Sequence, residues 1–226
     1  MSKIVYCGME SQGKSLLLGD RTRKILKRNK KYFTKYGFKR LLRSNLKLSE
    51  ELTEHYKDFI VYWNDVSEIV GKTGCDIIWD EISTDLSAQK REPLPPEINK
   101  WLRQGAKQGV HIYATAQEFH DIHLDFRRRV AEAYIVRKLL GSERGGENLP
   151  PVKWIWGICM YRQLKINPYN ELEPEYQDVI PRFFWIDKDR CSIFDTHQVI
   201  LTSEEIPLQH IERKCLKCGL KKTIHR

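Results

Sequence analysis

The segment from Gly8 to Ser15 carries the clearest chemical signal in this 226-residue sequence. It reads Gly8-Met9-Glu10-Ser11-Gln12-Gly13-Lys14-Ser15 and matches the pattern G-x-x-x-x-G-K-[ST] in full. In such a loop, backbone N–H groups surround phosphate oxygens, the lysine reaches the β- and γ-phosphates, and the final hydroxyl binds Mg²⁺. An apolar run, Lys3–Cys7, precedes the loop, and a helical pattern follows it. The segment is therefore predicted to bind ATP, with Ser15 as a ligand of Mg²⁺.

Two acids and one amide follow other strand-like runs and are predicted to complete this site. Asp80 and Glu81 follow the apolar run Cys75–Trp79, and Gln117 lies just beyond Val110–Thr115. Asp80 is predicted to support Mg²⁺, and Glu81 to take a proton from the attacking water. A solvated turn is the alternative interpretation of the two acids. Gln117 either contacts the γ-phosphate or the water, or is a surface or helix-capping residue.

A possible metal site is present near the carboxyl end of the sequence. Cys215 and Cys218 form a C-x₂-C pair, with His210 before it and His225 after it. Together these four side chains would supply a complete tetrahedral set of ligands for Zn²⁺. The spacing outside the cysteine pair matches no established zinc pattern, so a basic tail with two reduced thiols is the alternative.

Strand-like and helix-like patterns alternate along the chain, which predicts an α/β fold. The sheet is expected to be mainly parallel at least through residue 140, with helices flanking it. The expected strands are 1–7, 44–48, 59–63, 75–81, 110–115, 153–162, 182–187 and 191–194. The expected helices are 14–31, a helix capped by Ser49 that contains Glu50, Glu51 and Glu54, and 65–70, 97–108 and 124–140. A loop is expected from Ser83 to Pro96.

Charge is distributed unevenly in this chain, whose formal net charge is +9. The segment Arg21–Lys47 holds twelve Lys or Arg residues and no Asp or Glu. Such a patch predicts a polyanionic partner such as nucleic acid, and a solvated helix face is the alternative. No apolar run approaches the roughly 18 residues that a membrane-spanning helix needs, and the N-terminus lacks the layout of a signal peptide. A cytoplasmic protein with reduced thiols is expected.

The order of these motifs resembles the FtsK–HerA class of DNA-translocating P-loop ATPases. The resemblance rests on the phosphate loop, on Asp80-Glu81 followed by a proline-containing loop and a helix, and on Gly109–Gln117. Within the class, the chain is most similar to viral genome-packaging ATPases and to the zonula occludens toxin-like assembly ATPases of filamentous phages. The late run Ile193–Thr196 also resembles an element of that phage group.

This resemblance implies a P-loop NTPase fold of the RecA/ASCE type. It also implies that Lys14 and Ser15 bind phosphate and Mg²⁺, Asp80 supports Mg²⁺, Glu81 activates water and Gln117 acts as a sensor. Relatives commonly carry an arginine where this chain has Ala106. The arginine that acts on a neighbouring subunit is therefore unassigned, and the candidates are Arg103 and the run Arg127-Arg128-Arg129. For each candidate, a surface salt bridge is the alternative.

The leading hypothesis is an ATP-hydrolysing motor that moves single- or double-stranded DNA, most similar to a phage genome-packaging ATPase. Such a motor implies a ring of identical subunits, location in the host cytoplasm or with the virion, and contact with a capsid or portal-vertex protein. The alternatives are a filamentous-phage-type assembly or export ATPase, a nucleotide kinase, and a non-hydrolysing DNA-binding module. Residues 1–205 are expected to form the ATPase domain and residues 206–226 a basic tail.

Overall fold

The computed structural model describes residues 2–89, 92–105, 107–141, 155–166, 172–176, 180–194, 211–214 and 221–224. The chain forms two compact units, Met1–Thr196 and His197–Arg226. In the second unit, the described residues form an antiparallel pair of strands, β10 (Ile211–Lys214) and β11 (Lys221–Ile224). The predicted boundary after residue 205 lies in a segment outside the described residues.

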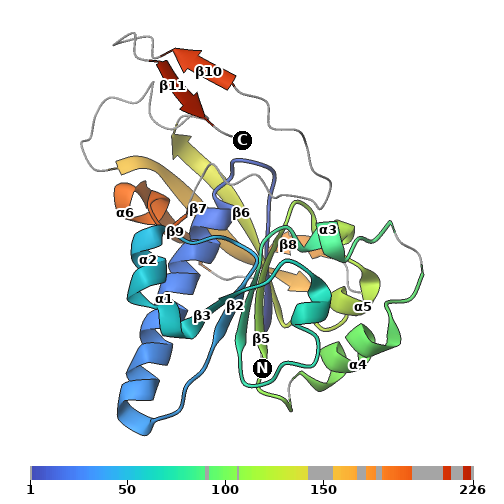
Figure 1. The fold of residues 1–226 in the computed structure, drawn as a ribbon. Helices are drawn as coiled ribbons and strands as arrows, with labels where there is room; N and C mark the ends of the chain where they lie inside the picture. Colours follow the sequence, from blue (N-terminus) through green and yellow to red (C-terminus); the bar gives the residue numbers. More distant parts are fainter. Residues whose placement is uncertain are drawn as a thin grey trace. The chain divides into compact units, whose positions relative to one another are not determined.

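The first unit is built on one large mixed sheet (Figure 1). Its strands are β1 (Lys3–Cys7), β2 (Leu42–Ser44), β3 (Ile60–Tyr62), β4 (Asp76–Trp79), β5 (His111–Ala116), β6 (Glu132–Gly141), β7 (Ile155–Ile166), β8 (Leu172–Tyr176) and β9 (Arg182–Asp187). Their order in the sheet is β3-β2-β4-β5-β1-β6-β7-β8, and β9 also pairs with β7. The strands from β3 to β6 are parallel, whereas β7 pairs antiparallel with β6, β8 and β9. The mainly parallel α/β sheet is therefore confirmed.

Helices cover both faces of the parallel part of the sheet. The helices of the first unit are α1 (Lys14–Tyr36), α2 (Glu50–His55), α3 (Ile82–Asp85), α4 (Pro96–Gln104), α5 (Leu124–Arg127) and α6 (Lys188–Cys191). Short 3₁₀ turns lie at η1 (Lys57–Phe59), η2 (Val66–Glu68) and η3 (Phe119–Asp121). None of the described helices is long and apolar enough to cross a membrane.

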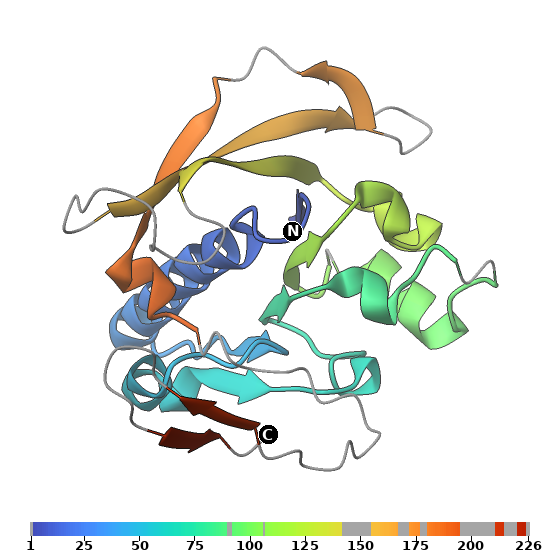
Figure 2. The same cartoon turned by 90° about the horizontal axis from the view of Figure 1, so that it is seen from above.

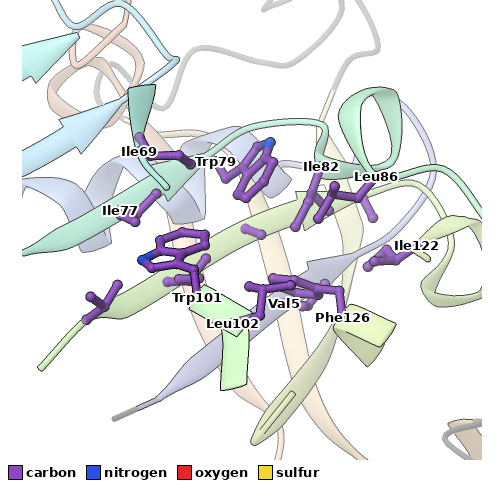
Figure 3. Close-up of a cluster of buried hydrophobic side chains, with 14 of the residues drawn as sticks. Val5, Ile69, Ile77, Trp79, Ile82, Leu86, Trp101, Leu102, Ile122 and Phe126 are labelled. Carbon is purple, nitrogen blue, oxygen red and sulfur yellow. The ribbon is translucent and has the colours of Figure 1, made fainter. Parts of the chain in front are cut away.

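Alternating side chains of the strands form two separate cores, because successive residues of a strand point to opposite faces. Val5, Ile77 and Trp79 pack on one face against residues of α4 and α5, including Trp101 and Phe126 (Figure 3). On the other face, residues such as Ile4, Tyr6 and Ile78 pack against α1 through Leu18, Ile25 and Leu26. The resulting three-layer arrangement holds the carboxyl ends of β1, β4 and β5 together at one edge.

Several boundaries differ from those predicted, and some elements were predicted wrongly. The loop expected from Ser83 to Pro96 overlaps α3, which ends at Asp85, and the strand expected over 44–48 lies at Leu42–Ser44. The helix expected over 124–140 is wrong, because α5 ends at Arg127 and β6 begins at Glu132. The run Tyr134-Ile135-Val136 is aromatic and β-branched, and it completes the pairing of β1 on the side opposite β5. The strand expected over 191–194 is also wrong, since α6 ends at Cys191 and Phe194 forms only an isolated bridge with Leu48.

Helix α1 is longer than predicted, and the ring of Phe194 packs against it. It runs five residues beyond the expected end at Lys31, to Tyr36. A Cβ atom added at Gly19 would lie 2.1 Å from the ring of Phe194, so a larger residue would collide there. The backbone N–H of Ser49 donates to the carbonyl of Ile193 at 2.9 Å. The segment around Phe194 is thus packed between α1 and the start of α2.

Candidate active site

The phosphate loop connects β1 to α1 and needs glycine at two positions. A Cβ atom at Gly8 would lie 2.5 Å from the carbonyl oxygen of Val136 on β6. Gly13 has φ +89°, and a Cβ atom there would lie 2.8 Å from Cys159 Sγ on β7. Backbone and neighbouring strands therefore approach too closely for a side chain at either position. The close packing shapes a loop whose backbone lies against β6 and β7.

The amino end of α1, where the loop ends, suits an anion. Its cap residue, Gly13, offers no side-chain hydrogen bond, and the first turn contains no acidic residue. The first N–H groups of a helix have no partner within the helix, and the helix dipole places partial positive charge there. A phosphate would accept hydrogen bonds from these N–H groups, and its negative charge would be attracted by the helix dipole. The amino end of this 23-residue helix is therefore suited to bind the predicted ligand.

Lys14 lies within the loop with its amino group held by backbone oxygens. Its Nζ donates to the carbonyl of Gly8 at 2.7 Å and to that of Met9 at 3.0 Å. The same Nζ lies 4.0 Å from Glu81 Oε1, and only 6% of the Lys14 side chain is exposed. The structure thus brings together the predicted phosphate-binding lysine and the predicted base, although they are 67 positions apart in the sequence.

Asp80 is held from several sides at the end of β4. Its Oδ1 accepts a hydrogen bond from Thr115 Oγ1 at 2.5 Å and one from Ser15 Oγ at 3.5 Å. Its backbone is fixed by Asn45, which accepts from the Asp80 N–H at 2.8 Å and donates to the Asp80 carbonyl at 2.9 Å. Burial raises the pKa of Asp80, while Thr115, Lys14 and Ser15 act in the opposite direction. A hydroxyl beside a carboxylate matches the oxygen ligands that Mg²⁺ prefers.

Glu81 adopts an unusual backbone conformation. Its φ of 53° and ψ of 52° are left-handed, and among the described residues only Ser11 and Glu81 have positive φ without being glycine. Both residues belong to this site, where such strain is commonly concentrated. The Glu81 N–H donates to Thr115 Oγ1 at 2.8 Å. Burial raises the pKa of Glu81, Lys14 lowers it, and the nearby Asp80 raises it further.

Gln117 joins the end of β5 to the phosphate loop. Its carbonyl accepts a hydrogen bond from the Gly8 N–H at 3.0 Å, and its side-chain Nε2 donates to Glu10 Oε1 at 3.5 Å. The side chain is exposed. The residue therefore borders the loop, and its role as a sensor stays a prediction.

Two contributing residues, Thr115 and Asn45, were not predicted, and neither was one contact of the predicted loop residue Gln12. Thr115 bridges Asp80 and Glu81, Asn45 brackets the Asp80 backbone, and Gln12 accepts from the Lys138 N–H at 2.7 Å. Thr115 is a polar residue at the carboxyl end of the mostly apolar predicted strand 110–115, which was an available signal. Asn45 had no such signal, because it lay near the start of the strand expected over 44–48. The contact between Gln12 and Lys138 had none, because β6 was expected to be a helix.

The arginine candidates lie on α4 and α5 rather than at this site. Arg103 is near the end of α4 and lines a surface hollow of about 420 Å³. Arg127 ends α5, and its guanidinium bonds to His120 Nδ1 at 3.0 Å. Arg129 donates to Asn99 Oδ1 at 3.0 Å, and Arg128 follows α5 directly. No described contact connects these side chains to Lys14 or Glu81 of the same chain.

The predicted zinc ligands His210, Cys215, Cys218 and His225 lie outside the described residues. Among the residues that are described, no group of three or more His, Cys, Asp or Glu side chains is placed to hold a metal ion.

Neither a known family profile nor a curated protein sequence matches this chain. Among solved structures, the N-terminal domain of zonular occludens toxin from Neisseria meningitidis is similar, with a TM-score of 0.50 and 17% identity over 86% of this chain and all of that domain. The genome-packaging NTPase of Sulfolobus turreted icosahedral virus 2, in complex with AMPPCP, has a TM-score of 0.42 and 13% identity over 59% of this chain and 74% of that one. The flagellar accessory protein FlaH from Methanocaldococcus jannaschii has a TM-score of 0.41 and 14% identity over 80% and 84% of the two chains. The likeness to the toxin domain, together with the phosphate loop between β1 and α1 and the mainly parallel sheet, shows that this chain has the fold of a P-loop NTPase.

Proposed function

We propose that this protein is an ATP-hydrolysing motor that translocates DNA, of the viral genome-packaging type. The observation that carries the hydrolytic part is Glu81, a carboxylate held in a left-handed conformation 4.0 Å from Lys14 and directly after Asp80. A site that only bound nucleotide would have no need for a strained acid beside the phosphate-binding lysine. The raised pKa of Glu81 also suits a proton acceptor.

Each residue has a separate role in the proposed reaction. Lys14 and the amino end of α1 bind the β- and γ-phosphates and hold the terminal phosphate in place. Ser15 and Asp80 would hold Mg²⁺, which supplies positive charge to the phosphate oxygens when it is bound. Glu81 accepts the proton of the attacking water, and the Thr115 hydroxyl fixes both acids through its bonds to Asp80 Oδ1 and the Glu81 N–H. Gln117 is proposed as the sensor of the γ-phosphate.

The DNA-translocating part of the proposal rests on motif order. The phosphate loop, Asp80-Glu81 and Gln117 occur in the order and context of FtsK–HerA ATPases, and the geometry places all three at one edge of the sheet. The proposed assembly is a ring in the host cytoplasm or with the virion, in contact with a capsid or portal-vertex protein. An arginine of a neighbouring subunit, Arg103 or one of Arg127–Arg129, would complete each site.

A filamentous-phage-type assembly or export ATPase is the second candidate. It is favoured by the likeness to the N-terminal domain of zonular occludens toxin, which extends over 86% of this chain. A nucleotide kinase is disfavoured, because a hydrolytic glutamate beside the phosphate site would waste ATP.

ATPase rate measured with and without DNA separates these functions. The motor should hydrolyse ATP faster when double- or single-stranded DNA is added, and Lys14→Ala should remove both nucleotide binding and turnover because it removes the charge that holds the phosphates. A kinase would require a small acceptor molecule, and a non-hydrolysing module would show no turnover. Lys72→Ala, which removes an exposed lysine distant from the loop in sequence, is the matched control and should behave as the parent.

A further inference from the structure

The structure divides the basic segment Arg21–Lys47 into two parts with different environments. In the first part, most charged side chains have partners within the chain, and the guanidinium of Arg21 lies 5.1 Å from the ring centre of Tyr113. The ion pairs of the segment are Arg23 and Lys24 with Asp20, and Arg28 and Arg40 with Asp76. The pair of Arg28 with Asp76 joins α1 to β4, whereas the pairs with Asp20 lie within α1. Beyond Asn29, every residue of α1 is exposed.

The distal end of α1 combines lysines with exposed aromatic side chains, and we call these eight residues the α1 tip. The exposed fractions are 49% for Tyr32, 44% for Phe33, 61% for Tyr36 and 59% for Phe38. Four exposed lysines alternate with these rings: Lys30, Lys31, Lys35 and Lys39. No acidic residue occurs anywhere between Arg21 and Lys47. Large apolar side chains gathered on a surface in this way mark an interaction site.

The α1 tip is a projection, and two of its aromatic rings contact one another. The last turns of α1 extend away from the sheet (Figure 1), and Gly37 ends the helix in a left-handed conformation with φ +69°. The rings of Tyr32 and Tyr36 stack with their centres 5.8 Å apart, and Lys35 Nζ lies 4.8 Å from the centre of the Tyr36 ring.

These features distinguish between the possible partners. Unpaired bases stack on open aromatic faces inside a basic groove, whereas these tyrosines cover each other and a lysine covers Tyr36. A DNA duplex is contacted through charge, which leaves the exposed rings without a role. The core of a protein interface is depleted in lysine, yet lysine is interleaved with these rings. Aromatic rings with flanking lysines on a helix suit the boundary of an anionic bilayer.

We propose that the α1 tip docks on the surface of a membrane that contains anionic phospholipids. Phe38 and Tyr36 enter the boundary between headgroups and acyl chains, and the four lysines contact lipid phosphates. The tip lies at the end of α1 opposite the phosphate loop, so docking leaves the nucleotide site accessible. This inference does not depend on the proposed motor activity.

Co-sedimentation of the full chain with lipid vesicles tests the inference. The parent should sediment with vesicles of phosphatidylcholine mixed with phosphatidylglycerol and remain in solution with phosphatidylcholine alone. Lys31→Gln/Lys35→Gln should weaken binding about 25-fold, at roughly fivefold for each lysine. Tyr36→Ser/Phe38→Ser should weaken it at least about tenfold, because less apolar surface is buried.

Matched controls test whether vesicle binding depends on the α1 tip or only on the positive charge of the protein. Lys72→Gln/Lys100→Gln removes the same charge from other exposed positions and should bind vesicles as the parent does. Lys14→Ala should also retain vesicle binding, and the tip variants should retain the parent ATPase rate. Parent protein that ignores anionic vesicles, or equal losses in tip and control variants, would overturn the inference. So would tip variants that lose oligonucleotide binding while vesicle binding persists, because the partner would then be nucleic acid.

Discussion

At the residue scale, Glu81 is the side chain on which hydrolysis is proposed to depend. Glu81→Gln keeps the size and nearly the shape of the side chain but cannot accept a proton. We expect the variant to bind ATP with the parent affinity and to hydrolyse it about 10²- to 10⁴-fold more slowly. Single-turnover hydrolysis and binding of a fluorescent ATP analogue measure the two quantities separately. Parent-rate turnover by this variant would falsify the assignment of Glu81 as the base.

The pH dependence of the rate gives a second residue-scale prediction. Burial, the principal cause, raises the pKa of Glu81, and Asp80 adds to that effect against the opposing charge of Lys14. Only the ionised carboxylate can accept a proton, so the rate should fall as the pH drops through this raised pKa. The decline should therefore begin at a higher pH than for an ordinary glutamate. Rates of the parent across the acidic range test this, and a decline centred at the ordinary glutamate value contradicts it.

At the scale of elements, one buried carboxylate connects α1, the segment before β2 and β4. Asp76, the first residue of β4, is fully buried. It accepts hydrogen bonds from Arg40 Nε at 2.7 Å, from Arg28 at 2.9 Å and from Asn29 at 3.1 Å. Burial opposes ionisation of Asp76, but Arg40, Asn29 and Arg28 outweigh it and hold its pKa below the ordinary value.

Removing Arg40 should therefore destabilise the fold. Arg40→Met leaves Asp76 buried without its main partner, and we expect a loss of roughly 3–5 kcal/mol in the free energy of unfolding. Lys39→Met, at the neighbouring exposed position, is the control and should change it by less than about 0.5 kcal/mol. Urea unfolding followed by circular dichroism measures both.

The lowered pKa of Asp76 also predicts how the stability of the native state changes with pH. A group whose pKa is lowered by folding stabilises the native state above its unfolded pKa, and that stabilisation is lost as the pH falls through the folded pKa. Acid should therefore destabilise the parent more than a variant in which Asp76 and its partners are replaced together by apolar residues.

At the scale of the whole molecule, the candidate arginines connect ATP hydrolysis with the assembly of subunits into a ring. Arg103 lines a hollow beside α4, Arg127 contacts His120 of η3, and Arg129 contacts Asn99 of α4. If one of them completes the site of a neighbour, activity per subunit should rise with protein concentration as rings form. Steady-state rates over a range of concentrations, with the mass of the assembly measured by light scattering, test this expectation.

Mixing two inactive variants tests the shared site directly. Glu81→Gln, and whichever of Arg103→Ala and Arg127→Ala removes the shared arginine, should each turn over ATP far more slowly than the parent when tested alone. When they are mixed, some intact Glu81 sites lie beside intact arginines, and part of the activity should return. Activity per subunit that stays constant from monomer to oligomer, with no recovery on mixing, excludes a site formed between subunits.

The sequence alone was sufficient to predict the class of the fold and which residues meet at the candidate site. Gly8–Ser15 after a short apolar strand, and Asp80-Glu81 and Gln117 after two others, are local patterns, because each depends on a strand and the turn that follows it. Parallel strands present their carboxyl ends at one edge of a sheet, so local patterns were sufficient to predict that these residues meet. The helix cap at Ser49 was likewise predictable, since its hydroxyl accepts from the Leu52 N–H within one turn.

Only the tertiary structure decided the features that depend on pairing between distant segments. The insertion of β5 between β1 and β4 places the Thr115 hydroxyl between Asp80 and Glu81, and no local signal shows the order of strands. Residues 132–141 form a strand because β1 has a free side to pair and β7 covers the other side, which outweighs the helical pattern. The left-handed conformation of Glu81 arises in the same way, since the bond from its N–H to Thr115 holds the turn from outside the local sequence.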